Sequence, residues 1–240
     1  MVGSVEEYKR GTLTVLCMAR ESYQDQLDTL RSDVLYMGEL VGDRLRTALS
    51  AMESKDDEAA MQVIRGDEEV NELYLELEGD CVDLLALQQP VASDLRFIAA
   101  SFKIITDLER IGDLATNLAD YSQDAERDVF PEVDIQSIGD KTLDMLEESM
   151  TAFNEEDTEA CLRIAEQDDE IDQLCREASE AVVRDLMEID VGNGEDTEQL
   201  MNDVSRLLLT VRDLERVGDH ATNIAARTLY MSEGDDQLIY

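Results

Sequence analysis

Tryptophan is absent from this chain of 240 residues, and proline and histidine are scarce. Pro90 and Pro131 are its two prolines, and His220 is its one histidine. Because so few prolines interrupt it, the chain can form long helices. One histidine excludes the paired Glu-x-x-His ligands of ferritin-type di-iron oxidases, and any Ser-His-Asp or Cys-His arrangement would have to use His220. Phosphate-binding loops of the GxxxxGK[ST] or GxGxxG kind are also missing.

Basic residues are few, with 20 Lys and Arg against 58 Asp and Glu, for a formal charge of -38. No basic stripe is available to replace the counterions of nucleic-acid phosphates, so direct binding to nucleic acid is not expected. This charge balance is typical of proteins kept soluble in concentrated salt, where a Debye length of about 3 Å at 1 M screens self-repulsion. We therefore expect a halophilic protein; an acidic protein from ordinary salt is the alternative.

The four cysteines, Cys17, Cys81, Cys161 and Cys175, show no CxxC spacing. Three of them fall within helical patterns, where a free cysteine acts as a small buried hydrophobe. No apolar run approaches the ~20 residues that span a bilayer, and the short stretch 13–19 lacks the architecture of a secretory signal. These features predict a cytoplasmic protein.

Apolar residues recur with the 3.6-residue period of helices through nearly the whole chain, which predicts an all-α fold. Pro90, Pro131 and the Gly192–Gly194 segment mark breaks between the predicted helices. The pattern predicts six long helices, over residues of about 22–53, 56–87, 92–127, 133–153, 157–189 and 196–231.

A segment of the third predicted helix recurs in the sixth. Asp107–Ala119 reappears as Asp213–Ala225, displaced by 106 positions, and several upstream residues match at a displacement of 101. A duplication at this scale predicts a tandem repeat of two three-helix bundles. The expected organisation is an N-terminal extension at 1–17, with translation starting at Met18, a first repeat at 18–130, a second at 131–231, and an acidic tail at 232–240.

Oxygen-bearing side chains follow one another at four-residue spacing on the last helix of each repeat. This spacing places them on one face, where stacked carboxylates repel unless solvent or a cation lies between them. These residues are Glu109, Asp113 and Asn117 in the first repeat, and Glu215, Asp219 and Asn223 in the second.

The preceding helix of each repeat supplies partners at the mirrored distance from the hairpin turn. They are Asp67 and Asn71 in the first repeat and Asp168 and Asp172 in the second. Because positions equidistant from a turn lie side by side in an antiparallel hairpin, four such side chains should converge in each repeat. Oxygen ligands without Cys or His suit Mg, Mn, Ca or iron. A fully solvated acidic face is the alternative.

Three basic or titratable residues adjoin the predicted sites. Arg110 and Arg216 follow the glutamates directly and could neutralise each site, meet a phosphate, or form a plain salt bridge. His220 replaces Leu114 of the first repeat and is expected to fill space in the core or at the surface, since it has no counterpart.

The segments Gln89–Arg96, Asp107–Asp113 and Asp213–Asp219 together resemble the PhoU family of phosphate-transport regulators, over nearly all of residues 18–231. The resemblance implies tandem three-helix bundles whose E(D)xxxD signature holds metal clusters, often of iron or zinc and sometimes of manganese or magnesium. That signature falls on Glu109/Asp113, Asp168/Asp172 and Glu215/Asp219. Asp67/Asn71 departs from it, because an asparagine replaces a carboxylate.

The resemblance also implies a role. It suggests a negative regulator of phosphate uptake and phosphate homeostasis, without enzymatic activity, that acts as a homodimer. The expected partners are the ATPase of the high-affinity phosphate ABC transporter and, in many bacteria, a phosphate-sensing histidine kinase, with membrane contact only through the transporter. Two other classes stay open: a metal-dependent phosphoester enzyme and a metal-free helical docking scaffold.

Overall fold

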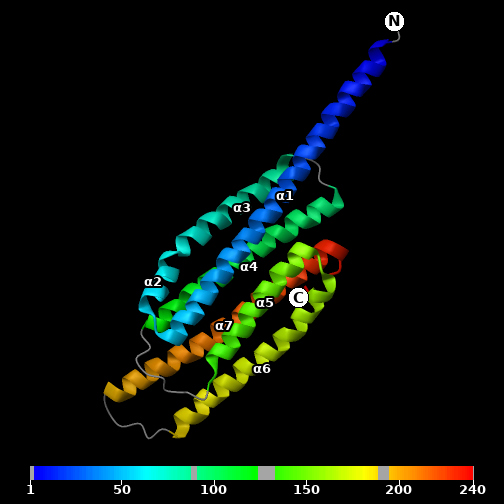
Figure 1. Cartoon of the computed structure of the whole chain (residues 1–240). Helices are drawn as coiled ribbons and strands as arrows, with labels where there is room; N and C mark the ends of the chain where they lie inside the picture. Colours follow the sequence, from blue (N-terminus) through cyan, green and yellow to red (C-terminus); the bar gives the residue numbers. More distant parts are fainter. Residues whose placement is uncertain (1–2, 88–90, 124–132, 189–194, 240) are drawn as a thin grey trace.

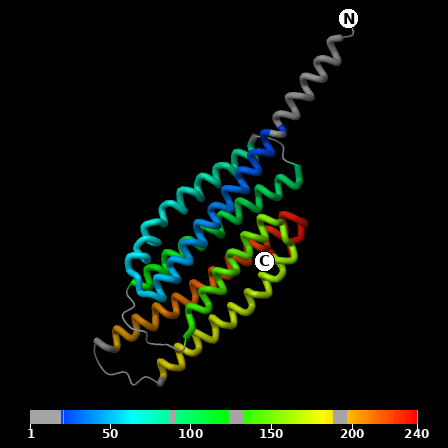
Figure 2. Tube along the Cα trace, in the orientation of Figure 1, coloured from blue at the N-terminus to red at the C-terminus, as the bar shows by residue number. Residues whose placement is uncertain are grey.

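The computed structural model describes residues 3–87, 91–123, 133–188 and 195–239, and over these residues it contains helices and no strand. Two units of three helical segments each lie side by side (Figures 1 and 2), and the second segment of the first unit is divided into two consecutive helices. The first consists of α1 (Gly3–Ser54), the consecutive helices α2 (Asp57–Arg65) and α3 (Asp67–Leu87), and α4 (Ala92–Gln123). The second consists of α5 (Ile135–Glu155), α6 (Thr158–Glu188) and α7 (Glu195–Glu233). The predicted tandem of helical bundles is confirmed.

The second predicted helix is interrupted at Gly66, so that the described residues form seven helices and not six. The Gly66 N–H donates to the carbonyls of Gln62 and Val63, which ends α2. The guanidinium of Arg44 lies over this glycine, and a Cβ there would be 2.9 Å from it. Repeat 2 has Gln167 at the matching position, inside the continuous α6. The interruption therefore belongs to the first repeat alone.

The turn between the first two helices is built in the same way in both repeats. Lys55 and Glu156 each have φ of 54°, the left-handed conformation that ends many helices. Asp56 and Asp157 follow them, and each carboxylate accepts hydrogen bonds from backbone N–H groups two and three residues later, at 3.0 to 3.1 Å. Each of these caps stabilises its helix by about 1 kcal/mol.

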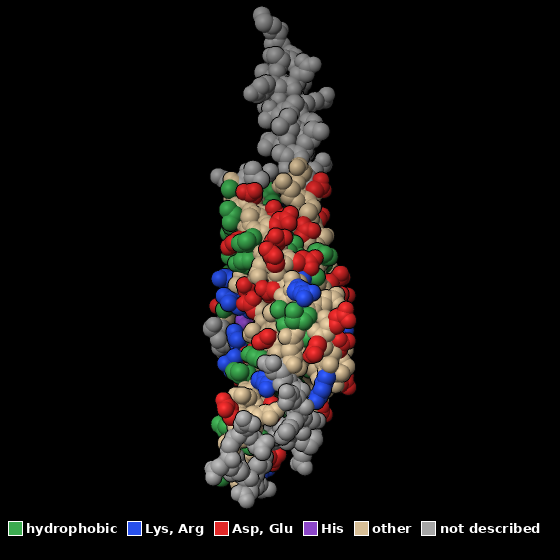
Figure 3. Space-filling model, turned by 90° about the vertical axis from the view of Figure 1, so that its left-hand side faces the viewer, with side chains coloured by type: hydrophobic (Ala, Val, Ile, Leu, Met, Phe, Trp, Pro, Cys, Tyr) green, Lys and Arg blue, Asp and Glu red, His purple; other side chains and the backbone are tan. Residues whose placement is uncertain are grey.

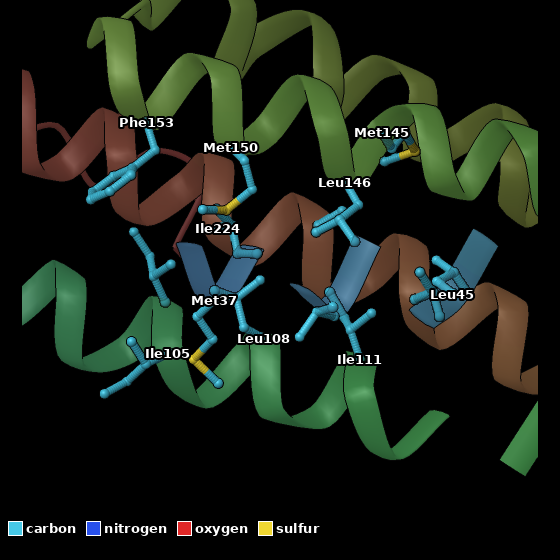
Figure 4. Packing of buried hydrophobic residues seen from close by; sticks show 14 of the residues in the cluster. Met37, Leu45, Ile105, Leu108, Ile111, Met145, Leu146, Met150, Phe153 and Ile224 are labelled. Carbon is cyan, nitrogen blue, oxygen red and sulfur yellow. The ribbon is translucent and has the colours of Figure 1, made fainter. Parts of the chain in front are cut away.

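One hydrophobic core serves both repeats (Figure 4). Helix α4 packs against α7, and α1 against α5, so that apolar residues of all four helices are excluded from water together. The labelled side chains of Figure 4 come from each of them: Met37 and Leu45, Ile105, Leu108 and Ile111, Met145, Leu146, Met150 and Phe153, and Ile224. Burying side chains of this size stabilises the fold by about 1.5 to 3 kcal/mol each.

The contact between α1 and α5 is reciprocal. A Cβ at Gly38 would lie 2.5 Å from the Met150 side chain, and a Cβ at Gly139 would lie 2.5 Å from Leu49. The two glycines are 101 positions apart, as are their two partners. The duplicated halves therefore pack as an internal pseudo-dimer, with each half supplying the same contact to the other.

Cys81, Cys161 and Cys175 are free and buried, as predicted. Burial raises their thiol pKa values to about 12, 11 and 12, so they remain protonated. Over the described residues, no helix has the length and apolar character needed to cross a membrane.

Several sequence-based predictions are not decided by the described structure. Pro90, Pro131 and Gly192–Gly194, predicted as breaks, lie outside the described residues, as does the side chain of Cys17. Helix α1 is continuous across the predicted boundary between residues 17 and 18. A translation start at Met18 stays a prediction, as do the other domain limits.

Candidate metal sites

The second repeat brings its predicted carboxylates together between α6 and α7. One carboxylate oxygen from each of Asp168, Asp172 and Asp219 lies within 4.8 Å of the others. Glu215 lies one helical turn before Asp219 on α7, and burial, followed by the charges of Asp172 and Asp219, raises its pKa. We call these four residues the repeat-2 cluster.

Asp168 is the most perturbed carboxyl of the repeat-2 cluster. Burial, followed by the charges of Asp219 and Asp172, raises its pKa to about 6. The Thr222 hydroxyl acts in the opposite direction on that pKa. Even so, neither the hydroxyl oxygen nor Asp168 Oδ1 has a well-formed hydrogen bond to any described residue, although both are buried. Asp168 thus has a buried oxygen without a well-formed hydrogen bond among the residues that the structure describes.

The pKa values of two other carboxyls of this cluster are also raised by their surroundings. Burial and then the charge of Asp172 raise the pKa values of both Glu215 and Asp219. Arg176 opposes this for Glu215, while His220 and Arg216 oppose it for Asp219. Crowded anions of this kind are stabilised by a cation that accepts their oxygens as ligands.

The first repeat brings Asp67 and Asn71 of α3 next to Glu109 and Asp113 of α4; we call these four residues the repeat-1 cluster. Burial and then Asp113 raise the pKa of Glu109, and burial and then Asp67 raise that of Asp113. The side chains at matching distances from the hairpin turn therefore influence one another in both repeats, and in the second repeat three of them have carboxylate oxygens within 4.8 Å of one another.

Asp67 differs from its counterpart Asp168, because its oxygens already have donors. Asn71 Nδ2 donates to Asp67 Oδ2 at 3.0 Å. Thr116 Oγ1 lies 3.2 Å from Asp67 Oδ1, and at the same distance from the carbonyl of Gly112. The repeat-1 cluster is thus partly satisfied by its own residues.

The two predicted arginines are placed differently. Arg110 approaches both carboxylates of its own helix, with Nε 3.5 Å from Glu109 and Nη1 3.8 Å from Asp113. Arg216 lies 3.7 Å from Asp213, and its charge partly offsets the rise in the pKa of both Asp113 and Asp219. Arg216 therefore acts on both clusters at once.

Asn117 and Asn223, predicted as ligands, are used at the interface between the repeats. Asn117 Nδ2 donates to Asp213 across the α4–α7 contact at 3.5 Å, and Asn223 Nδ2 donates to Asp107 at 3.4 Å. The reason is geometric: eight residues of α-helix advance about 80° beyond two full turns, which carries these side chains away from the glutamates. The structure gives both asparagines a contact other than metal ligation.

Thr116 and Thr222 were not identified from the sequence, although they contact or adjoin Asp67 and Asp168. Each lies seven residues after a cluster glutamate, and seven residues return to within about 20° of the same face. A search at spacings of four and seven would have found them.

Asp107 and Asp213 occupy equivalent positions at the α4–α7 interface. Asp213 is fully buried and accepts hydrogen bonds from Arg212 at 2.8 Å and Tyr121 at 3.1 Å. Asp107 lies 2.9 Å from Nδ1 of His220, the residue that was expected to fill space. His220 is therefore part of the polar contact between the repeats.

The repeat-2 cluster fits a hard or borderline cation. Its donors are carboxylate oxygens, one of them buried without a well-formed hydrogen bond to the described part of the chain, and Gly218 leaves room for α6 to approach. Such a donor set suits Mg²⁺, Mn²⁺ or iron; zinc is more often held through Cys and His. The identity of the metal stays a prediction, as do the ligand assignments.

The sequence and the helical architecture of this chain are similar to those of known proteins. Residues 34–122 and 135–228 each match the PhoU domain. The phosphate-specific transport system accessory protein PhoU homolog of Pseudomonas putida is 34% identical over 90% of this chain and 82% of its own length. The phosphate-specific transport system accessory protein PhoU of Escherichia coli is 34% identical over 89% of this chain and 86% of its own.

The crystal structure of PhoU from Pseudomonas aeruginosa superposes with a TM-score of 0.82, at 33% identity. It covers 89% of this chain and is itself covered completely. Matching domains in both repeats, relatives of similar length and a shared arrangement of helices lead to one conclusion: the chain belongs to the PhoU family.

Proposed function

We propose that this chain is an accessory protein of phosphate-specific transport that restrains phosphate uptake when phosphate is plentiful. The observation that carries the proposal is the match of both repeats to the PhoU domain, in a chain that covers most of the length of relatives named for this role. We place it in the cytoplasm as a homodimer. Its proposed partners are the ATPase of the phosphate transporter and, where the cell has one, a phosphate-sensing histidine kinase.

Metal ions bound by the carboxylate clusters are part of this proposal. Asp168, Asp172, Glu215 and Asp219 would hold a cation in the second repeat, and the residues of the repeat-1 cluster would do so in the first. The bound ion supplies positive charge where the protein gathers anions. Between the two clusters, Arg216 supplies a fixed positive charge of the chain itself. The proposed role of these sites is to fix the helix pairs and the surface they present to a partner.

The distribution of charged side chains favours a regulatory role over a catalytic one. Figure 3 shows Asp and Glu side chains spread along one face of the molecule, while Lys and Arg gather around its middle. The functional side chains described above are carboxylates and amides, which suit cation binding, together with arginines that suit contact with anionic groups. A partner protein is therefore a better proposed target than a phosphoester substrate.

Phosphate uptake in the native host tests the proposal. Cells lacking the gene should take up radiolabelled phosphate faster than the parent in phosphate-rich medium, and the wild-type chain supplied from a plasmid should restore the lower rate. Equal uptake by the parent and the deletion strain would reject the proposal. A phosphomonoester assay on the purified, metal-loaded chain distinguishes the proposed regulator from a phosphoester enzyme, because only the enzyme would turn over the substrate.

A further inference from the structure

The duplicated carboxylate clusters are built from matching positions, but their hydrogen bonding is different. In the repeat-1 cluster Asn71 Nδ2 donates to one oxygen of Asp67 at 3.0 Å. The Thr116 hydroxyl lies 3.2 Å from the other oxygen and shares its one hydrogen with the carbonyl of Gly112.

In the repeat-2 cluster Asp172 stands in place of Asn71, so Asp168 lacks the amide donor that Asp67 has. Asp168 Oδ1 is buried without a well-formed hydrogen bond to the described residues, although the nearby Thr222 hydroxyl opposes the rise in the Asp168 pKa. An oxygen that is already hydrogen-bonded must give up that bond before it can ligate an ion, whereas a buried oxygen without a partner gains from any ligand.

The positions of Asp67 and Asp168 within their helices add to this difference between the two clusters. Because of the interruption at Gly66, Asp67 is the first residue of α3, where the partial positive charge of a helix N-terminus stabilises an anion. Asp168 lies inside the continuous α6 and has no helix end nearby. The charge of Asp67 is therefore compensated by its own helix, and that of Asp168 is not.

The ligand chemistry differs in the same direction. Asn71 stands where the second repeat has Asp172, so the repeat-1 cluster has one negative charge fewer. Its amide also uses an N–H on Asp67, which turns a potential ligand into an internal donor. Within the described residues, the group of carboxylates whose oxygens lie within 4.8 Å of one another is that of Asp168, Asp172 and Asp219.

We infer that the two repeats have diverged into a tight and a weak cation site: the repeat-2 cluster binds a divalent cation first, and the repeat-1 cluster is held mainly by its own hydrogen bonds. This inference rests on the proposed metal binding. It goes beyond it by assigning the order of occupancy, and Asn71 as the residue that lowers the affinity of the first repeat.

Titration of the full-length, chelator-stripped chain with Mn²⁺ tests the inference, with free Mn²⁺ measured by its electron paramagnetic resonance signal. The wild type should show a tight class of binding. Asp168→Asn should weaken that class by about tenfold or more, the scale of effect seen when a metal site is disturbed. Asp67→Asn, the matched control, should leave the tight class unchanged. Asp172→Asn should weaken the tight class too, and it replaces Asp168→Asn should that variant fail to fold.

Replacing a residue of the repeat-1 cluster by its repeat-2 counterpart should have the opposite effect and raise the Mn²⁺ affinity of the first repeat. Asn71→Asp, which copies Asp172 and removes the amide donor to Asp67, should tighten the weak class and leave the tight class as it was. Loss of the tight class in Asp67→Asn, an equal effect of Asp67→Asn and Asp168→Asn, or the absence of Mn²⁺ binding in the wild type would overturn the inference. Phosphate uptake in the deletion strain is measured separately, so a role in transport can stand while this order of occupancy fails.

Discussion

Gly218 lies against the carboxylate of Asp168, and a Cβ at residue 218 would be 3.2 Å from Asp168 Oδ1. We expect Gly218→Ala to displace that carboxylate by a few tenths of an ångström. The crowding should cost about 1 kcal/mol of unfolding free energy and lower the affinity for Mn²⁺. Calorimetric titration and urea unfolding measure the two effects.

Two other glycines serve as controls for this substitution. Gly112, at the equivalent position of α4, faces Val70 at the same 3.2 Å, so Gly112→Ala causes similar crowding without moving a carboxylate of the repeat-2 cluster. Gly79 has nothing within 4 Å, so Gly79→Ala should stabilise α3 by about 0.5 to 1 kcal/mol. Mn²⁺ affinity in Gly218→Ala equal to that in Gly112→Ala would contradict the close contact with Asp168.

The pKa of Asp168 predicts how stability depends on pH in the metal-free protein. Its pKa rises from 3.8 to about 6 on folding, so between these values the folded state binds more protons than the unfolded state. Stability contributed by this group is therefore complete below pH 3.8 and is lost as the pH rises through about 6. Asp168→Asn should accordingly raise the melting temperature at pH 7.5 and change it little at pH 4.

The same comparison with Mn²⁺ present supplies the control. The cation should stabilise the wild type at pH 7.5 more than it stabilises Asp168→Asn, since the ion relieves the repulsion that the substitution has already removed. A metal-free variant that melts below the wild type at pH 7.5 would show that the Asp168 charge is compensated in some other way.

Arg31 joins α1 to the end of α5 and to α4. Its guanidinium donates to the carbonyl of Phe153 at 3.3 Å, pairs with Glu156 at 2.6 Å and lies over the rings of Phe97 and Phe153 at 5.0 and 5.6 Å. Arg31→Met should lower the unfolding free energy by about 1 to 2 kcal/mol, through the lost cation–π and carbonyl contacts. Urea unfolding checks this value.

Glu156→Gln tests which part of the Arg31 contact matters. Glu156 is half exposed, with 49% of its side chain accessible, so its ion pair should contribute little and the variant should stay close to the wild type. A loss as large in Glu156→Gln as in Arg31→Met would assign the stabilisation to the ion pair instead.

The helical pattern and the duplication were sufficient to predict the tandem bundles and the pairing of the carboxylates across each hairpin. Equal distance from a turn is a property of any antiparallel hairpin, which is why Asp168 meets Asp219 as expected. The interruption at Gly66 was not predicted, although a glycine within a helical pattern is a local signal for a helix end. The position of Arg44 from α1 over this glycine is visible only in the structure.

The interface contacts of the two asparagines predicted as ligands could not be foreseen from their spacing. A step of eight residues turns Asn117 and Asn223 from the cluster to the neighbouring repeat, and their contacts with Asp213 and Asp107 depend on how α4 packs against α7. The presence of Asn71 where the second repeat has Asp172 was visible in the sequence, but the hydrogen bond from Asn71 to Asp67 was not. Only the position of each side chain reveals it.

The net charge of -38 predicts a strong dependence of stability on salt. Screening falls as the Debye length grows from about 3 Å at 1 M to about 10 Å at 0.1 M, so repulsion among the carboxylates should lower the melting temperature on desalting. Circular dichroism at 222 nm against temperature measures this effect across a series of KCl concentrations. Full helicity and an unchanged melting temperature at low salt would contradict the halophilic interpretation.

The central claim is that the chain restrains phosphate uptake through its repeat-2 cluster, and uptake by cells carrying a disabled cluster tests it most directly. The deletion strain is supplied with the wild-type chain, with Asp168→Asn/Asp219→Asn, or with Gly79→Ala as a control, and radiolabelled phosphate uptake is measured in phosphate-rich medium at matched protein levels. We predict that the double variant leaves uptake as high as in the deletion strain, while Gly79→Ala restores the lower rate. A folded double variant that restrains uptake as well as the wild type would contradict the claim.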